Sequence, residues 1–151
     1  MNMRRFFFCL LVMVIISGCS IDNGVNTSVN FDAAEITGNN LPDEFVFGQQ
    51  FQLSITYNLP SACHRFAGID AKREGNTSSQ RRNIFIAVVT SVNSNIECSD
   101  TNTSLERTAE LPVIIDENEE FTFNFLVGET AGGEAIYETV VVPVVNSSVG
   151  N

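Results

Sequence analysis

Two stretches with alternating side chains decide the fold: residues 51–59 read Phe-Gln-Leu-Ser-Ile-Thr-Tyr-Asn-Leu, and residues 121–127 read Phe-Thr-Phe-Asn-Phe-Leu-Val. Successive side chains of a strand point to opposite faces, so each stretch predicts a strand with one apolar and one more polar face. Residues 84–92 are instead almost wholly apolar, which predicts a central strand covered on both faces. Such strands need a common core, so the sequence predicts one all-β domain.

Further strands are expected where turn-forming residues separate other apolar stretches. They are expected around 29–36, at 45–47, and over 62–73, 103–115 and 135–145. Turns are expected at 74–79, 116–120 and 130–134. About seven strands with short turns predict an antiparallel β-sandwich of immunoglobulin-like or fibronectin-like architecture, with a jelly roll or small barrel as the alternative.

The composition excludes several classes of protein. The chain has 151 residues, enough for one domain, and its 44 % hydrophobic and 17 % charged residues are typical of a globular fold. Eighteen acidic residues against eight basic ones give a formal net charge of −10, which argues against nucleic-acid binding. One histidine and no tryptophan leave little material for histidine-based catalysis or an aromatic sugar cleft.

The N-terminus has the features of a bacterial export signal. Arg4 and Arg5 precede an unbroken apolar run over residues 6–16, and residues 16–19 read Ile-Ser-Gly-Cys. This motif resembles the lipobox of bacterial lipoproteins, in which the cysteine becomes the lipidated first residue of the mature protein. The resemblance implies a diacylglycerol on the Cys19 sulfur, a further acyl chain on its amine, and membrane attachment through these lipids. An ordinary secretory signal or a retained membrane anchor is the alternative.

The resemblance also predicts a location and a domain organisation. Ser20 stands where an aspartate would favour the inner membrane, so we expect an outer-membrane lipoprotein that faces either the periplasm or the cell surface. The segments are a signal peptide (1–18), the lipidated cysteine with a flexible tether (19–30), the β-sandwich (31–146) and a C-terminal tail (147–151). Loss of two arginines with the signal leaves six basic and eighteen acidic residues, a formal charge of −12.

Cys63 and Cys98 remain once Cys9 is lost with the signal and Cys19 is lipidated. The bacterial envelope oxidises thiols, so an even pair there predicts a disulfide. The alternative is a metal site that also uses His64, but it lacks a fourth ligand at the usual spacing.

No catalytic centre and no cofactor are expected. His64 is the only histidine, its neighbour Cys63 is expected to be oxidised, and no Gly-x-Ser-x-Gly stretch presents a nucleophile, so we expect a solvated side chain. The acidic run 116–120 lacks the glycine and glutamate of an EF-hand calcium loop, so a solvated hairpin turn is expected there.

Most of the basic residues of the mature chain are clustered. Five of the six lie within eighteen residues: Arg65, Lys72, Arg73, Arg81 and Arg82. They flank one expected hairpin, so strand pairing would gather them at one end of the domain as a site for an anionic partner. The alternative is that they only protect an exposed sheet edge from aggregation.

These observations favour a lipid-anchored, non-enzymatic module that binds another envelope protein or an anionic polymer. Two alternatives from other classes are a protease inhibitor acting through a loop of the sandwich and, less favoured, a hydrolase that uses paired carboxylates.

Overall fold

The computed structural model describes residues 28–146, apart from 96, 99–100 and 102–103. In this part the chain is mostly β, as predicted, with nine strands and one short helix. The elements are β1 (Val29–Asn39), β2 (Phe45–Val46), β3 (Gln50–Asn58), β4 (Arg65–Arg73), α2 (Ser78–Arg82), β5 (Asn83–Asn93), β6 (Glu106–Ile114), β7 (Phe121–Glu129), β8 (Ala135–Val142) and β9 (Val144–Val145).

The described residues do not include the predicted signal (1–18), Cys19 or the tail (147–151), which remain predictions. Strand β1 begins at Val29, as expected for the strand around 29–36.

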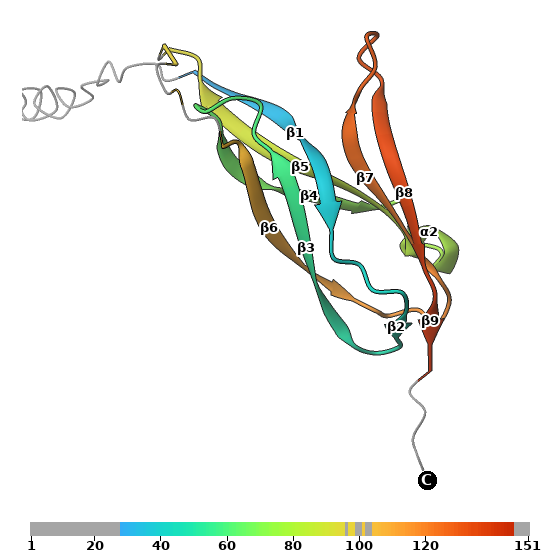
Figure 1. The fold of residues 1–151 in the computed structure, drawn as a ribbon. Helices are drawn as coiled ribbons and strands as arrows, with labels where there is room; N and C mark the ends of the chain where they lie inside the picture. Colours follow the sequence, from blue (N-terminus) through green and yellow to red (C-terminus); the bar gives the residue numbers. More distant parts are fainter. Residues whose placement is uncertain (1–27, 96, 99–100, 102–103, 147–151) are drawn as a thin grey trace, which may run out of the picture.

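Seven strands form one sheet in the order β6-β3-β1-β5-β7-β8, and β4 pairs with β5 as well (Figure 1). All but one of these pairs are antiparallel. The exception is β5 with β7, which pair in parallel from Asn83 opposite Thr122 to Ile86 opposite Phe125. The sheet is therefore mixed, whereas the sequence predicted an antiparallel one. The chain connection explains the parallel pair. After β5 the chain forms β6 beside β3, and it then returns as β7, which runs along β5 in the same direction.

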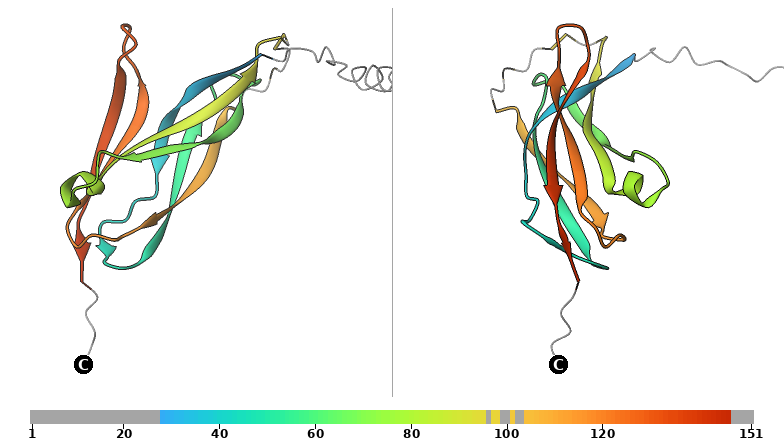
Figure 2. Two further views of the ribbon diagram at one scale, coloured as in Figure 1. Left: turned by 180° about the vertical axis from the view of Figure 1, so that it is seen from behind. Right: turned by 90° about the vertical axis from the view of Figure 1, so that its right-hand side faces the viewer.

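Strand β1 connects the two halves of this sheet. Its first half, Val29–Ala34, pairs with β5, and its second half, from Glu35 to Asn39, pairs with β3. The register shifts between Ile36 and Gly38, where the strand changes course. The β3–β6 half and the β4–β5–β7–β8 half are thus joined through β1 (Figures 1 and 2).

The two halves bury one common core. The largest fully buried side chains include Leu53 and Ile55 of β3, Ile86 and Val88 of β5, and the three phenylalanines of β7, Phe121, Phe123 and Phe125. Each set occupies alternate positions of its strand, which confirms the alternation in residues 51–59 and 121–127. Full burial of an aliphatic or phenylalanine side chain contributes about 1.5–3 kcal/mol, so these faces carry most of the stabilisation.

Strand β5 departs from its prediction. Ile84, Ile86, Val88 and Thr90 are buried on one face, but the residues between them are only half-buried. The expectation of a strand covered on both faces is therefore wrong for the described chain, since no element covers its second face.

The C-terminal strand predicted over 135–145 is divided at Pro143, which has no N–H to donate to a ladder. The carbonyl oxygen of Pro143 instead accepts a hydrogen bond of 2.8 Å from the Phe45 N–H, and β9 pairs in parallel with β2. Before the break, β7 and β8 form a long hairpin whose turn lies at residues 130–134, as predicted. This hairpin diverges from β1 and β5 towards its tip (Figure 1; Figure 2, left).

Candidate functional site

The connection between β4 and β5 carries three of the predicted basic residues. A turn was expected at 74–79, and the structure has the five-residue helix α2 beginning within that range, at Ser78. Thr77 caps the helix, because its hydroxyl accepts from the Gln80 N–H and the Gln80 side chain accepts from the Thr77 N–H, both at 3.4 Å. This pattern of Thr followed three residues later by Gln is a capping box, a local signal that the sequence does contain. The helix places Arg81 and Arg82 in its last turn.

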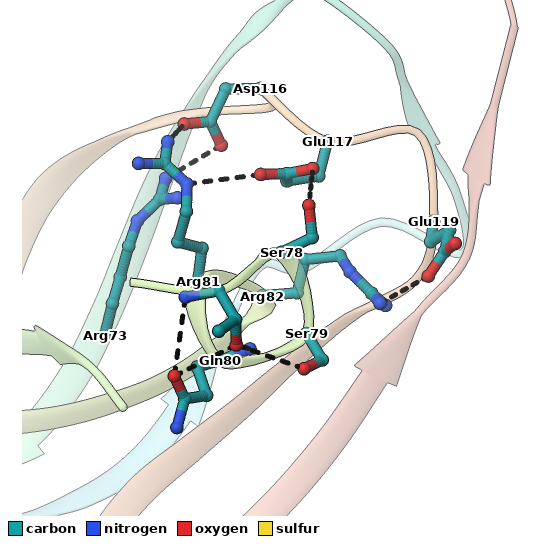
Figure 3. A network of polar contacts seen from close by, with 10 residues as sticks. Arg73, Ser78, Ser79, Gln80, Arg81, Arg82, Asp116, Glu117 and Glu119 are labelled. Atoms are coloured by element: carbon teal, nitrogen blue, oxygen red, sulfur yellow. Dashed lines mark hydrogen bonds and ion pairs between the residues drawn. The ribbon is translucent and has the colours of Figure 1, made fainter. Parts of the chain in front are cut away.

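Two arginines converge on one carboxylate of the loop between β6 and β7. Arg73, at the end of β4, donates to Asp116 Oδ1 at 2.9 Å, and Arg81 donates to Asp116 Oδ2 (Figure 3). Arg81 also donates through Nε to Glu117 at 3.2 Å, and the Ser78 hydroxyl donates to the same carboxylate at 3.0 Å. Charge-assisted hydrogen bonds of this kind are about twice as strong as neutral ones.

The third arginine of the connection, Arg82, binds the same loop further along. It forms an ion pair with Glu119 and donates to the backbone oxygen of Glu120 at 3.0 Å. Its side chain is 15 % exposed, the least of the three arginines. We call Arg73, Arg81, Arg82, Asp116, Glu117 and Glu119 the ion-pair cluster.

The ion-pair cluster has balanced formal charge, with three arginines and three acidic residues. Burial raises the pKa of the Asp116 carboxyl, but the hydrogen bond and positive charge of Arg73, with the hydrogen bond from Arg81, outweigh burial and hold this pKa below 3.8. Asp116 therefore stays ionised near neutral pH, and the arginines already have anionic partners within the chain. An external carboxylate or phosphate would have to displace those partners.

The loop 116–120 also differs from its prediction. It was expected to be a solvated hairpin turn, but β6 pairs with β3 while β7 pairs with β5 and β8. The loop thus crosses between the two halves of the sheet, and its acidic side chains bind α2 and the end of β4.

The other two predicted basic residues lie elsewhere. Arg65 is at the opposite end of β4 from Arg73, and its guanidinium donates to the backbone oxygens of Ala62 and His64. Lys72 forms an exposed ion pair of 2.8 Å with Asp70, and the hydrogen bond from Lys72 to this carboxylate raises the pKa of Lys72. The expectation that all five would gather at one end of the domain is therefore wrong, since the length of β4 separates Arg65 from the rest.

The predicted disulfide between Cys63 and Cys98 is confirmed. It joins the turn between β3 and β4 to the segment after β5, with the two Cα atoms 5.7 Å apart. Among the described residues, no group of three or more histidine, cysteine or acidic side chains is placed to hold a metal ion.

His64 lies beside this disulfide and is buried, 9 % exposed, so the expected solvated side chain is wrong. Its Nδ1 is 2.8 Å from the Ser61 hydroxyl, and its Nε2 is 3.0 Å from an Asp32 carboxylate oxygen. The Ser61 hydroxyl also accepts from the Cys63 N–H at 3.3 Å. Serine, histidine and aspartate thus form a line of hydrogen bonds that the sequence did not reveal, because Asp32 is remote along the chain.

This line differs from a hydrolase triad in two respects. In the serine protease arrangement the histidine Nε2 faces the serine and Nδ1 faces a buried aspartate. Here the two nitrogens have the opposite partners, and the Asp32 side chain is 51 % exposed. Water therefore screens the charge that would stabilise an imidazolium, and the hydrogen bonds instead fix the turn after β3 to strand β1.

No protein-family model, no curated protein and no solved structure matches this chain. Among the described residues, no helix is long and apolar enough to cross a membrane.

Proposed function

We propose that this protein is a lipid-anchored, non-enzymatic binding module of the bacterial envelope, whose partner is another envelope protein. The observation that carries the proposal is the β7–β8 hairpin, which diverges from the rest of the fold and exposes Ile136, Tyr137 and Val141. Exposed apolar side chains on a projecting element are typical of interaction surfaces. The ionic groups of the ion-pair cluster, by contrast, are already engaged within the chain.

The fold supports the same class of function. We infer that the described strands form an immunoglobulin-like β-sandwich, in which β1 contributes to both layers and the common core lies between them. Such a domain is a rigid scaffold that presents strands and loops to partners. The Cys63–Cys98 disulfide is consistent with an oxidising compartment.

The lipid anchor of the proposal rests on the motif Ile-Ser-Gly-Cys at 16–19. The mature chain has a formal charge of −12, counted from its six basic and eighteen acidic residues, and anionic head groups would repel it. The lipids on Cys19 are therefore the source of membrane attachment in this proposal.

An experiment in cells tests the anchor and the binding function together. The wild-type protein and a Cys19→Ser variant that retains an export signal are cross-linked in intact cells. We expect the wild type to be in the membrane fraction, to incorporate a fatty-acid analogue and to cross-link reproducibly to one envelope protein, whereas the variant incorporates no label. Equal membrane retention and labelling of the variant would contradict the anchor.

A hydrolase is the competing function that one observation favours, namely the line Ser61–His64–Asp32. A fluorophosphonate probe, which reacts with activated serines, distinguishes the two functions. We expect no labelling of Ser61 in the folded, disulfide-bonded domain, because the histidine nitrogens and the aspartate are arranged unlike a triad. Labelling that a Ser61→Ala variant abolishes would overturn the non-enzymatic proposal.

A further inference from the structure

Three strands of the seven-stranded sheet have a partner on one side only within the described residues: β4, β6 and β8. Such an edge presents unpaired N–H and C=O groups, and it can therefore pair with a strand of another chain. Proteins usually protect their edge strands with charged side chains or proline, so the composition of each edge indicates whether pairing there is prevented.

Two of the three edges are protected in this way. Strand β4 carries Arg65, Asp70, Lys72 and Arg73, and strand β6 carries Glu106, Arg107, Glu110 and Pro112. Strand β8 differs, since it reads Ala-Ile-Tyr-Glu-Thr-Val-Val-Val and has one charged residue, Glu138, and no proline. The charges on β4 fit the edge-protecting role that was the alternative to anion binding.

The first part of strand β8 is also accessible on both faces. Residues 135–139 are all exposed, and Ile136, Tyr137 and Val141 are 43 %, 42 % and 51 % exposed. Tyr137 and Val141 lie on one face of the strand and Ile136 lies on the other, so each face carries exposed apolar side chains. An added strand would place its own alternate side chains beside them, which is how edge pairing obtains specificity.

The edge is held in an extended shape before any partner binds. The Thr139 hydroxyl donates to Asn124 Oδ1 at 2.9 Å, and Asn124 Nδ2 donates to Asn83 Oδ1 at 2.7 Å. This polar ladder connects β8 through β7 to β5. The rings of Tyr137 and Phe85 also meet at a centroid distance of 5.4 Å, in an edge-to-face contact. A preformed edge lowers the ordering cost of binding.

The charge of the hairpin indicates the chemistry of its partner. Residues 121–146 contain no lysine, arginine or histidine, and they carry Glu129, Glu134 and Glu138. All three are exposed, and no ion pair of theirs occurs among the described residues. A second copy of this chain would bring the same carboxylates together, which disfavours pairing. A strand that carries lysine or arginine would be complementary.

We propose that β8 is a strand-addition edge that takes an extended, basic segment of a partner protein. The proposal rests on the proposed binding function and names its surface. Backbone hydrogen bonds to β8 supply the pairing, apolar side chains of the segment lie beside Tyr137 and Val141, and its basic side chains lie near the hairpin carboxylates.

The test uses two synthetic peptides with blocked termini and about eight residues each, the length of β8. In one peptide valine alternates with threonine and lysine, and in the other valine alternates with threonine and glutamate. Binding to the oxidised domain is measured by fluorescence anisotropy at low salt. We expect the lysine peptide to bind, the glutamate peptide to bind at least about tenfold more weakly, and the difference to shrink as salt screens the charges.

Variants locate the binding surface. Val141→Lys and Tyr137→Lys place on β8 the kind of side chain that protects β4, and each should weaken binding of the lysine peptide at least about tenfold. The matched control is Ile114→Lys, since Ile114 is 60 % exposed on another edge strand, β6. It should leave binding unchanged. Thermal unfolding of each variant shows that the domain remains folded.

Several results would overturn the proposal: no binding of the lysine peptide, equal binding of both peptides, or an equal loss in Ile114→Lys. Concentration-dependent dimers that Val141→Lys abolishes would identify a second copy as the occupant and overturn the basic-partner proposal. If the cellular partner still cross-links to Val141→Lys as to the wild type, the edge proposal fails while the binding function stands. If no partner cross-links to the wild type, the binding function itself fails.

Discussion

Asp116 is the residue on which two elements depend. Its carboxylate accepts from Arg73 of β4 and from Arg81 of α2, and it lies at the start of the loop that crosses from β6 to β7. If this carboxylate is removed, each arginine keeps its positive charge in a partly buried position. Loss of Asp116 should therefore cost more than loss of an exposed acidic residue.

The first prediction concerns acid stability. The folded-state pKa of Asp116 is depressed, so its contribution to the free energy of unfolding is fully present above its ordinary pKa of 3.8 and is lost as pH falls through the lower folded value. Asp116→Asn should be less stable than the wild type by about 1–2 kcal/mol at pH 7, and the gap should narrow below about pH 4.

Urea denaturation at pH 7, 5 and 3 would measure this gap. The control is Asp43→Asn, because Asp43 is exposed and no ion pair of it occurs in the described part of the chain. A constant gap between wild type and Asp116→Asn across the three pH values would contradict the role assigned to the carboxylate.

At the scale of elements, the ion-pair cluster connects α2 and β4 to the β6–β7 loop. The three arginines come from residues 73–82 and the acids from residues 116–119. The ion pairs therefore attach α2, a short helix with no buried side chain, to the β6–β7 loop. A five-residue helix is not stable in isolation. These contacts, together with the capping box, therefore hold α2 in place.

The second prediction follows from this connection. Reversal of the three arginines in Arg73→Glu, Arg81→Glu and Arg82→Glu combined should lower the free energy of unfolding by about 2–4 kcal/mol, since their four ion pairs become like-charge contacts. Arg65→Glu is the matched control, because the Arg65 side chain donates to backbone oxygens at the other end of β4 and should cost less than about 0.5 kcal/mol. Chemical denaturation measures both, and a triple variant as stable as the control would show that the cluster contributes nothing.

Prediction from sequence succeeded for features that short stretches encode. Leu53 and Ile55, like Phe121 and Phe123, recur every second residue, so the core faces of β3 and β7 follow from local alternation. The cysteine pair followed from counting the cysteines that remain after Cys9 and Cys19 are assigned to the expected signal and lipid anchor. Helix α2 has a local signal too, the pair Thr77 and Gln80, but it is too short for a periodic pattern.

The features that were missed depend on partners distant in the chain. Arg73 and Asp116 are 43 positions apart, and Asp32 and His64 are 32 apart, so neither contact has a local pattern. The parallel pairing of β5 with β7 likewise depends on where the chain goes between them. The sequence also predicted a site for an anionic partner at the five clustered basic residues, although four of them form ion pairs with acids of the chain.

At the scale of the whole molecule, the disulfide closes a large part of the chain. Cys63 and Cys98 are separated by 35 positions, and the segment between them contains β4, α2 and β5. A cross-link of this length removes unfolded-state entropy worth roughly 4 kcal/mol in the chain-entropy model.

The third prediction is that Cys98→Ala lowers the melting temperature by roughly 10 °C or more. The reduced wild type should melt at nearly the same temperature as the variant, because both lack the same cross-link. Calorimetry with and without reductant measures the three samples. A Cys98→Ala domain with the same melting temperature as the oxidised wild type would show that the disulfide does not stabilise the fold.

The parallel pair of β5 and β7 has a consequence for the order in which the fold can form as the chain emerges. A chain that emerges with its N-terminus first during synthesis can pair β3 with β1, and β4 with β5, as soon as these segments emerge. The core must wait for Phe121, Phe123 and Phe125, which come from β7 and complete it against β5. The apolar faces of the earlier strands are thus open to water and to chaperones until β7 arrives. We expect a chain ended after β6 to remain protease-sensitive and chaperone-bound, because β7 has not yet completed its core.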